Sequence, residues 1–97
     1  MPKRTRDYRG WLRKQLTDPA AAANYINAAI EDSPDMLLVA VRNVAEAQKM
    51  AKVASRAGVN RETLYRTLSD EGNPTLDTLS SVLDALGLEI AVKVQDR

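Results

Sequence analysis

Proline and glycine recur along this chain at intervals that allow only short helices between them. Asp18-Pro19 and Ser33-Pro34 each place a capping residue before proline, an order typical of helix N-termini because proline loses no hydrogen bond at the first helical position. Gly58, the Gly72-Asn73-Pro74 run and Gly87 are turn or helix-end signals. Between these breaks, apolar residues recur three and four positions apart, which is the period of an amphipathic helix. The sequence therefore predicts a compact, mainly α-helical domain of five to six short helices.

The length and the missing residue types narrow the function. With 97 residues the chain forms one domain, for which we expect a disordered basic arm at residues 1–7 and a folded domain over residues 8–97. The absence of cysteine excludes disulfides and thiolate metal sites, and the absence of histidine removes the commonest general base and metal ligand. The longest apolar-rich stretch, residues 20–30, is about half as long as a membrane span. We therefore expect a soluble cytoplasmic protein that is not an enzyme and needs no cofactor, metal or membrane.

Charge is segregated along the sequence, even though the formal net charge is only +1. Residues 1–14 carry a net charge of +5, residues 49–66 carry +4, and the rest of the chain carries −8. Charges that serve only solubility are mixed more evenly than this. Two basic blocks in an otherwise acidic chain indicate a localised surface that binds anions.

Residues 50–68 have the spacing of a helix-turn-helix, in which two short helices meet at a sharp angle. Ala54 is small enough to let the two helix axes approach closely. Gly58 occupies the turn, where a positive φ would cost a residue with a side chain about 1–2 kcal/mol. Leu64 and Leu68 then fill the core between the helices. The opposite face of the second helix is therefore predicted to be exposed.

This exposed face carries the side chains that we expect to read DNA. A recognition helix lies in the major groove with its N-terminal residues toward the base edges, where arginine donates two hydrogen bonds to guanine. The predicted base-reading residues are Asn60, which also caps the helix, Arg61, Glu62, Tyr65 and Arg66, and the predicted phosphate contacts are Lys49, Lys52 and Arg56. One alternative is an ordinary helical hairpin with a solvated charged face. Another is a helical adaptor whose basic face binds acidic protein partners.

The C-terminal residues change from the helical period to a period of two. Leu88, Ile90, Val92 and Val94 alternate with polar or small residues over residues 88–94, which is a strand pattern. The sequence contains no second strand pattern, and a lone strand leaves its backbone groups unpaired. We therefore predict that this β-strand pairs with the same strand of a second copy, giving a homodimer. The alternative is an extended tail that packs its apolar face on the helices.

Five motifs spread over residues 8–88 bear a family resemblance. They are YRGWL (8–12), DPAAAANYINAAI (18–30), VAEA (44–47), GVNRETLYRTLSDEGNPTLDTL (58–79) and VLDALGL (82–88). The GNP run after the recognition helix is the most specific part, because a generic helix-turn-helix does not require it. With these motifs the chain resembles the addiction-module antidote proteins, which are small antitoxins of the Xre-like helix-turn-helix class, related to HigA-type antitoxins.

The resemblance implies a fold, a function and partners. The fold is that of an Xre/lambda-repressor-like domain with an N-terminal helical extension, here residues 8–32. The function is that of a type II antitoxin, which neutralises a RelE/ParE-like toxin and represses its own operon on double-stranded operator DNA. Trp11 and Tyr25 in the extension are candidates for toxin binding, unless both aromatic side chains belong to the core. The alternative function is a stand-alone prophage-type repressor without a toxin partner.

Overall fold

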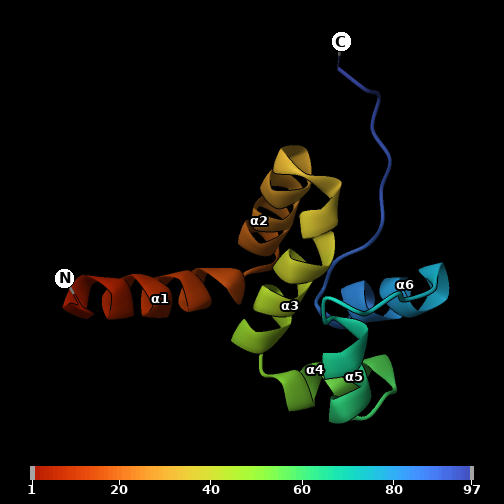
Figure 1. The fold of residues 1–97 in the computed structure, drawn as a ribbon, viewed down its shortest axis with the longest axis horizontal. Helices are drawn as coiled ribbons and strands as arrows, with labels where there is room; N and C mark the ends of the chain where they lie inside the picture. The colour runs from red at the N-terminus through yellow and green to blue at the C-terminus, as the bar shows by residue number, and fades with distance from the viewer. Residues whose placement is uncertain (1, 97) are drawn as a thin grey trace.

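The computed structural model describes residues 2–96 and the side chains of residues 8–96. These residues form six α-helices and one 3-10 turn, with no strand among them (Figure 1). The elements are α1 (Pro2–Leu16), α2 (Pro19–Asp32), the 3-10 turn η1 (Pro34–Met36), α3 (Leu37–Ala47), α4 (Met50–Ala57), α5 (Arg61–Thr67) and α6 (Leu76–Ala85). The prediction of a mainly helical domain is confirmed. Among the described helices, none has both the length and the apolar character that a bilayer span demands.

Three helices begin where the sequence places a capping side chain. Asp18 before α2, Asn60 before α5 and Thr75 before α6 each accept a hydrogen bond from the backbone N–H three residues ahead. The Ser33-Pro34 signal gives a different result, because the Ser33 side chain makes no capping bond. Its proline opens the turn η1, and α3 starts only at Leu37.

The core consists of aliphatic side chains, as expected for a chain without phenylalanine. It forms where α2 packs against α3 and where α4 packs against both α5 and α6. The largest fully buried side chains are Val41, Val44, Val53, Leu64, Leu68, Val82 and Leu86. Because α4 and α5 both contribute to this core, packing fixes their mutual orientation.

Helix α1 differs from the others because it projects away from the body of the molecule (Figure 1). Its last residue, Leu16, is buried, whereas Tyr8 and Trp11 are 60 and 56 % exposed and stack with their ring centroids 6.0 Å apart. The backbone of residues 2–7 is helical and continues this helix, whereas the sequence predicts a disordered arm over residues 1–7, of which residue 1 lies outside the described residues. Residues 3–9 contain neither proline nor glycine, so no strong helix breaker separates them from the rest of α1.

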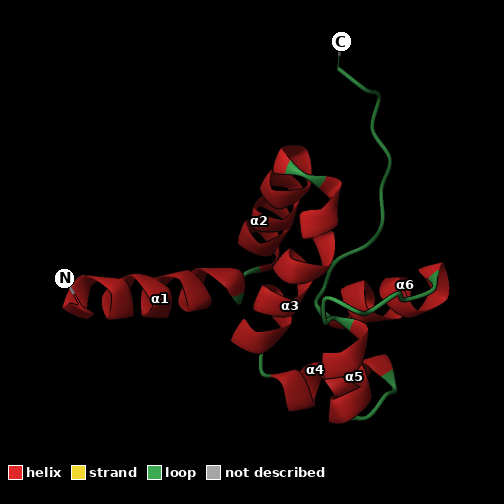
Figure 2. Cartoon of the chain, viewed as in Figure 1, coloured by secondary structure: helices red, strands yellow, loops and turns green. Residues whose placement is uncertain are grey.

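The C-terminal tail, residues 88–96, is extended but belongs to no strand (Figure 2). Leu88 packs partly against the core and Ile90 is 44 % exposed, whereas Val92 and Val94 are 96 and 93 % exposed. A strand needs a hydrogen-bonded neighbour, and the described residues contain no other strand that could pair with this one. The predicted β-strand over residues 88–94 is therefore not supported.

Candidate nucleic-acid interface

Helices α4 and α5 are separate and meet at a sharp turn around Gly58, as the sequence predicts. Gly58 has φ 75° and ψ 26°, a left-handed conformation that glycine adopts without penalty. The N–H of Val59 donates to the Ala54 carbonyl at 3.0 Å and closes the end of α4. A Cβ atom at position 58 would meet no heavy atom within 4 Å. Backbone conformation, and not lack of space, therefore requires glycine here.

One face of α5 is held in the core and the other is free. Leu64 is fully buried, and Leu68, directly after the helix, is 2 % exposed. The Asn60 side chain accepts a 2.7 Å hydrogen bond from the Thr63 N–H, which fixes where the helix begins. The exposed members of the predicted base-reading set are Asn60, Arg61, Glu62 and Arg66.

Tyr65 is placed differently from the rest of this set. Its ring is half-buried, and the guanidinium carbons of Arg42 and Arg61 lie 5.8 and 5.9 Å from the ring centroid. Aromatic rings attract cations at such distances. Arg42 is also paired with Glu46 at 3.2 Å. Tyr65 thus connects α5 to α3 and holds Arg61, and no signal in the sequence places Arg42 beside it.

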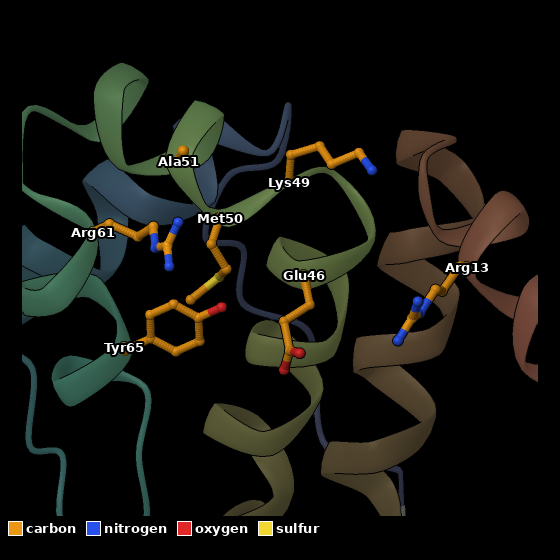
Figure 3. Close-up of a pocket in the computed structure, with 7 residues that line it drawn as sticks. All are labelled: Arg13, Glu46, Lys49, Met50, Ala51, Arg61 and Tyr65. Atoms are coloured by element: carbon orange, nitrogen blue, oxygen red, sulfur yellow. The ribbon is translucent and has the colours of Figure 1, made fainter.

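An open hollow of about 310 Å³ lies where α1, the start of α4 and α5 come together (Figure 3). Three cationic side chains line it, Arg13 from α1, Lys49 from the link before α4, and Arg61 from α5. The rest of the lining is Glu46, Met50, Ala51 and Tyr65. In Figure 3, Arg61 and Tyr65 lie on one side and Arg13 on the other, with Glu46 between them. The hollow therefore brings Lys49, a predicted phosphate contact, close to Arg61, a predicted base-reading residue. It also contains Arg13, which the sequence analysis does not assign to the site.

The amino end of α4 borders this hollow and has no capping side chain. Lys49 occupies the N-cap position with φ 78° and ψ 109°, and its side chain makes no capping hydrogen bond. A residue with a Cβ atom adopts such a conformation at a cost of about 1–3 kcal/mol. A helix N-terminus carries about half a positive charge, so an uncapped one among cationic side chains favours an anion such as phosphate. The other predicted phosphate contacts, Lys52 and Arg56, are exposed on α4.

The Gly72-Asn73-Pro74 run lies against the end of α5. The Gly72 N–H donates to the Ser69 carbonyl at 2.8 Å. A Cβ atom at position 72 would lie only 2.0 Å from the carbonyl oxygen of Thr67. Only glycine lets the chain pass this close to the helix backbone, and the run therefore fixes how the chain leaves α5.

The chain is similar to known proteins over most of its length. A family model described as "Probable addiction module antidote protein" matches residues 11–94. An uncharacterized protein of Haemophilus influenzae is 36 % identical over 83 residues, which cover 84 % of this chain and 86 % of that relative. No solved structure matches the chain.

Proposed function

Since the chain belongs to the family of probable addiction module antidote proteins, we propose that it is the antitoxin of a type II toxin–antitoxin module. It neutralises a RelE/ParE-like toxin and represses its own operon by binding operator DNA. In this proposal α4 and α5 form the helix-turn-helix of an Xre-like domain, with α5 as the recognition helix. Both activities are binding events and need neither a catalytic group nor a cofactor.

One observation carries the DNA-binding part, namely that the free face of α5 adjoins the cationic hollow. With α5 in a major groove, Arg61 and Arg66 reach base edges and donate to guanine. A backbone phosphate then lies at the uncapped start of α4, between Arg13 and Lys49. Lys52 and Arg56 extend the phosphate contacts along α4. One surface thus combines base reading with the contacts that set the register on the duplex.

Tyr65 has a supporting role in this proposal. Its ring lies between Arg42 and Arg61, so it limits the conformations that Arg61 samples before DNA arrives. An arginine that is already oriented loses less side-chain entropy on binding. Asn60 and Glu62, at the amino end of α5, complete the base-reading face.

We also propose that two copies bind the operator together. Helix α5 has seven residues, so a single copy reads only a few base pairs. A second copy places another recognition helix on a half-site about 34 Å away, one turn of the duplex. The operator is then expected to be a near-palindrome.

The test of the DNA-binding part is a footprint of the purified chain on the promoter of its own gene. The wild type should protect two half-sites, and Arg66→Ala should lose the protection. Lys93→Ala removes another exposed cation, from the tail, and should leave the footprint unchanged. A wild type that protects no segment at moderate salt contradicts the proposal and favours an adaptor for acidic proteins.

The test of the antitoxin part is co-expression with the product of the open reading frame that adjoins this gene. That product should stop growth when expressed alone, and this chain should restore growth. If the promoter footprint is present but the neighbouring product is harmless or is not neutralised, the chain is a stand-alone repressor instead.

A further inference from the structure

An apolar groove of about 440 Å³ lies between α2, α3, α6 and the C-terminal tail. Its lining includes Ile30 and Leu37 on one side, Leu76 and Leu79 on the other, and Ile90 from the tail. Leu76 is 72 % exposed and Ile90 is 44 % exposed, which is unusual for large aliphatic side chains that lie together. None of the predicted DNA-contacting residues lines this groove.

The groove lies entirely in the acidic part of the chain. All of its lining residues come from residues 15–41 and 67–92, two stretches that contain no lysine or arginine. The same two stretches hold nine of the thirteen acidic residues, Asp18, Glu31, Asp32, Asp35, Asp70, Glu71, Asp77, Asp84 and Glu89. The cations of the chain are concentrated instead in α1 and in the α4–α5 region. An apolar surface formed by segments that carry carboxylates and no cations is complementary to a basic partner.

One carboxylate lines the groove, and three more belong to residues that neighbour lining residues in the sequence. Glu89 is part of the lining, and Glu31, Asp77 and Asp84 directly follow lining residues in the sequence. All four residues are exposed. Glu31 is paired with Lys93 of the tail at 3.2 Å, but both side chains are largely exposed, so the pair adds little to stability. A partner can therefore replace this contact and move the tail at small cost.

We propose that this groove is the docking site for a basic protein, namely the toxin whose existence rests on the function proposed above. The partner inserts an apolar side chain between Leu76 and Ile90 and places lysine or arginine side chains on Glu89 and on the neighbouring exposed carboxylates. Because the groove shares no residue with the predicted DNA-contacting set, the chain can hold toxin and DNA at once. The partner therefore does not need the exposed aromatic pair of α1, Tyr8 and Trp11.

A second copy of this chain fits the same groove less well. In a two-fold symmetric dimer the same patch occurs on both subunits, so one acidic groove would face another. Like charges placed opposite each other oppose association. A copy that instead used its basic α1 would form a head-to-tail contact, which does not close and leads to chains of molecules.

The test measures binding of the purified product of the adjoining open reading frame by isothermal titration calorimetry. Leu76→Glu and Ile90→Glu should each raise its Kd by about 10- to 100-fold, because each places a charge where an apolar anchor is buried. Val94→Glu is the matched control, because Val94 is an exposed tail residue outside the groove, and its Kd should change less than about twofold. Binding should also weaken as salt is raised.

The variants are chosen so that they fold. Leu76 is the first residue of α6, where a glutamate is favoured by the helix dipole, and Ile90 lies in the tail outside any helix. Both variants should keep wild-type circular dichroism and wild-type affinity for promoter DNA.

Three results overturn the inference in distinguishable ways. If the wild type binds the neighbouring protein and the groove variants bind it equally well, the site lies elsewhere, and a loss in Trp11→Ala would place it on α1. If Leu76→Glu instead abolishes self-association seen by light scattering while toxin binding is unchanged, the groove joins copies of this chain. If the wild type itself binds nothing, the proposed antitoxin function fails together with its docking site.

Discussion

Helix α5 and the C-terminal tail both carry clear apolar patterns, but only α5 forms the element that its pattern predicts. Leu64 of α5 and Leu68 directly after it meet a core built by the same chain, and the Asn60 side chain caps the first turn. In the tail, Leu88 reaches that core, whereas Val92 and Val94 remain almost fully exposed. Apolar periodicity therefore specifies a structure only where the same chain supplies the surface against which the apolar side chains pack. Four changes test this difference, in order of decreasing expected effect.

The largest effect is expected where backbone meets backbone at the end of α5. Gly72→Ala places a Cβ atom 2.0 Å from the Thr67 carbonyl oxygen, and the displaced atoms belong to the helix backbone. We expect the free energy of unfolding, measured by urea denaturation, to fall by about 3 kcal/mol. Gly10→Ala is the control, because a Cβ atom there meets nothing within 4 Å and alanine favours the helix. An unchanged urea midpoint for Gly72→Ala would show that the loop does not depend on this close approach.

The next change removes the cap that starts α5. Asn60→Ala deletes the 2.7 Å bond to the Thr63 N–H and should lower the free energy of unfolding by about 1 kcal/mol. Asn24→Ala, at an exposed position inside α2, should change it by less than about 0.5 kcal/mol. Equal effects of the two variants would mean that the cap does not fix this helix.

A smaller effect of opposite sign is expected at the uncapped start of α4. Lys49→Gly relieves the positive φ and should raise the free energy of unfolding by up to about 1 kcal/mol, partly offset by the entropy that glycine adds to the unfolded chain. The same variant should bind promoter DNA more weakly, because it loses a charge from the hollow. Lys52→Gly, inside α4, should lower both stability and DNA affinity. If Lys49→Gly lowers the free energy of unfolding as much as Lys52→Gly does, the backbone at Lys49 is not strained.

The smallest effect is expected in the tail. Deleting residues 92–97 removes Val92 and Val94, which are nearly fully exposed, and the exposed Lys93–Glu31 ion pair, and the free energy of unfolding should change by less than about 0.5 kcal/mol. If this deletion lowers the denaturation midpoint as much as Asn60→Ala does, the tail contributes to stability as α5 does, and the difference between the two regions disappears. Such a result would mean that the tail is already part of the folded unit.

The sequence was sufficient for features that depend on neighbouring residues. The caps at Asp18 and Asn60 and the left-handed turn at Gly58 are local, and the sequence predicts them correctly. The sequence alone does not decide between an arm and a helix over residues 1–7, because a polar segment without proline or glycine is compatible with both. Tyr65 and Arg13 could not be placed from sequence, because their surroundings come from α3, α4 and α5, which meet only in the folded chain. The predicted strand over residues 88–94 is not supported, because an alternating pattern does not say which other strand would pair with it.

The proposed function depends most on whether the free face of α5 reads the bases of DNA. Fluorescence anisotropy titrations should compare the promoter duplex with a scrambled duplex of equal length at one fixed salt concentration. For the wild type, we expect clearly tighter binding to the promoter, and Arg61→Ala should reduce this preference by about 1–3 kcal/mol while binding to the scrambled duplex falls far less. If Arg61→Ala and Arg66→Ala both leave the ratio of the two affinities unchanged, α5 does not read the operator and the account is wrong.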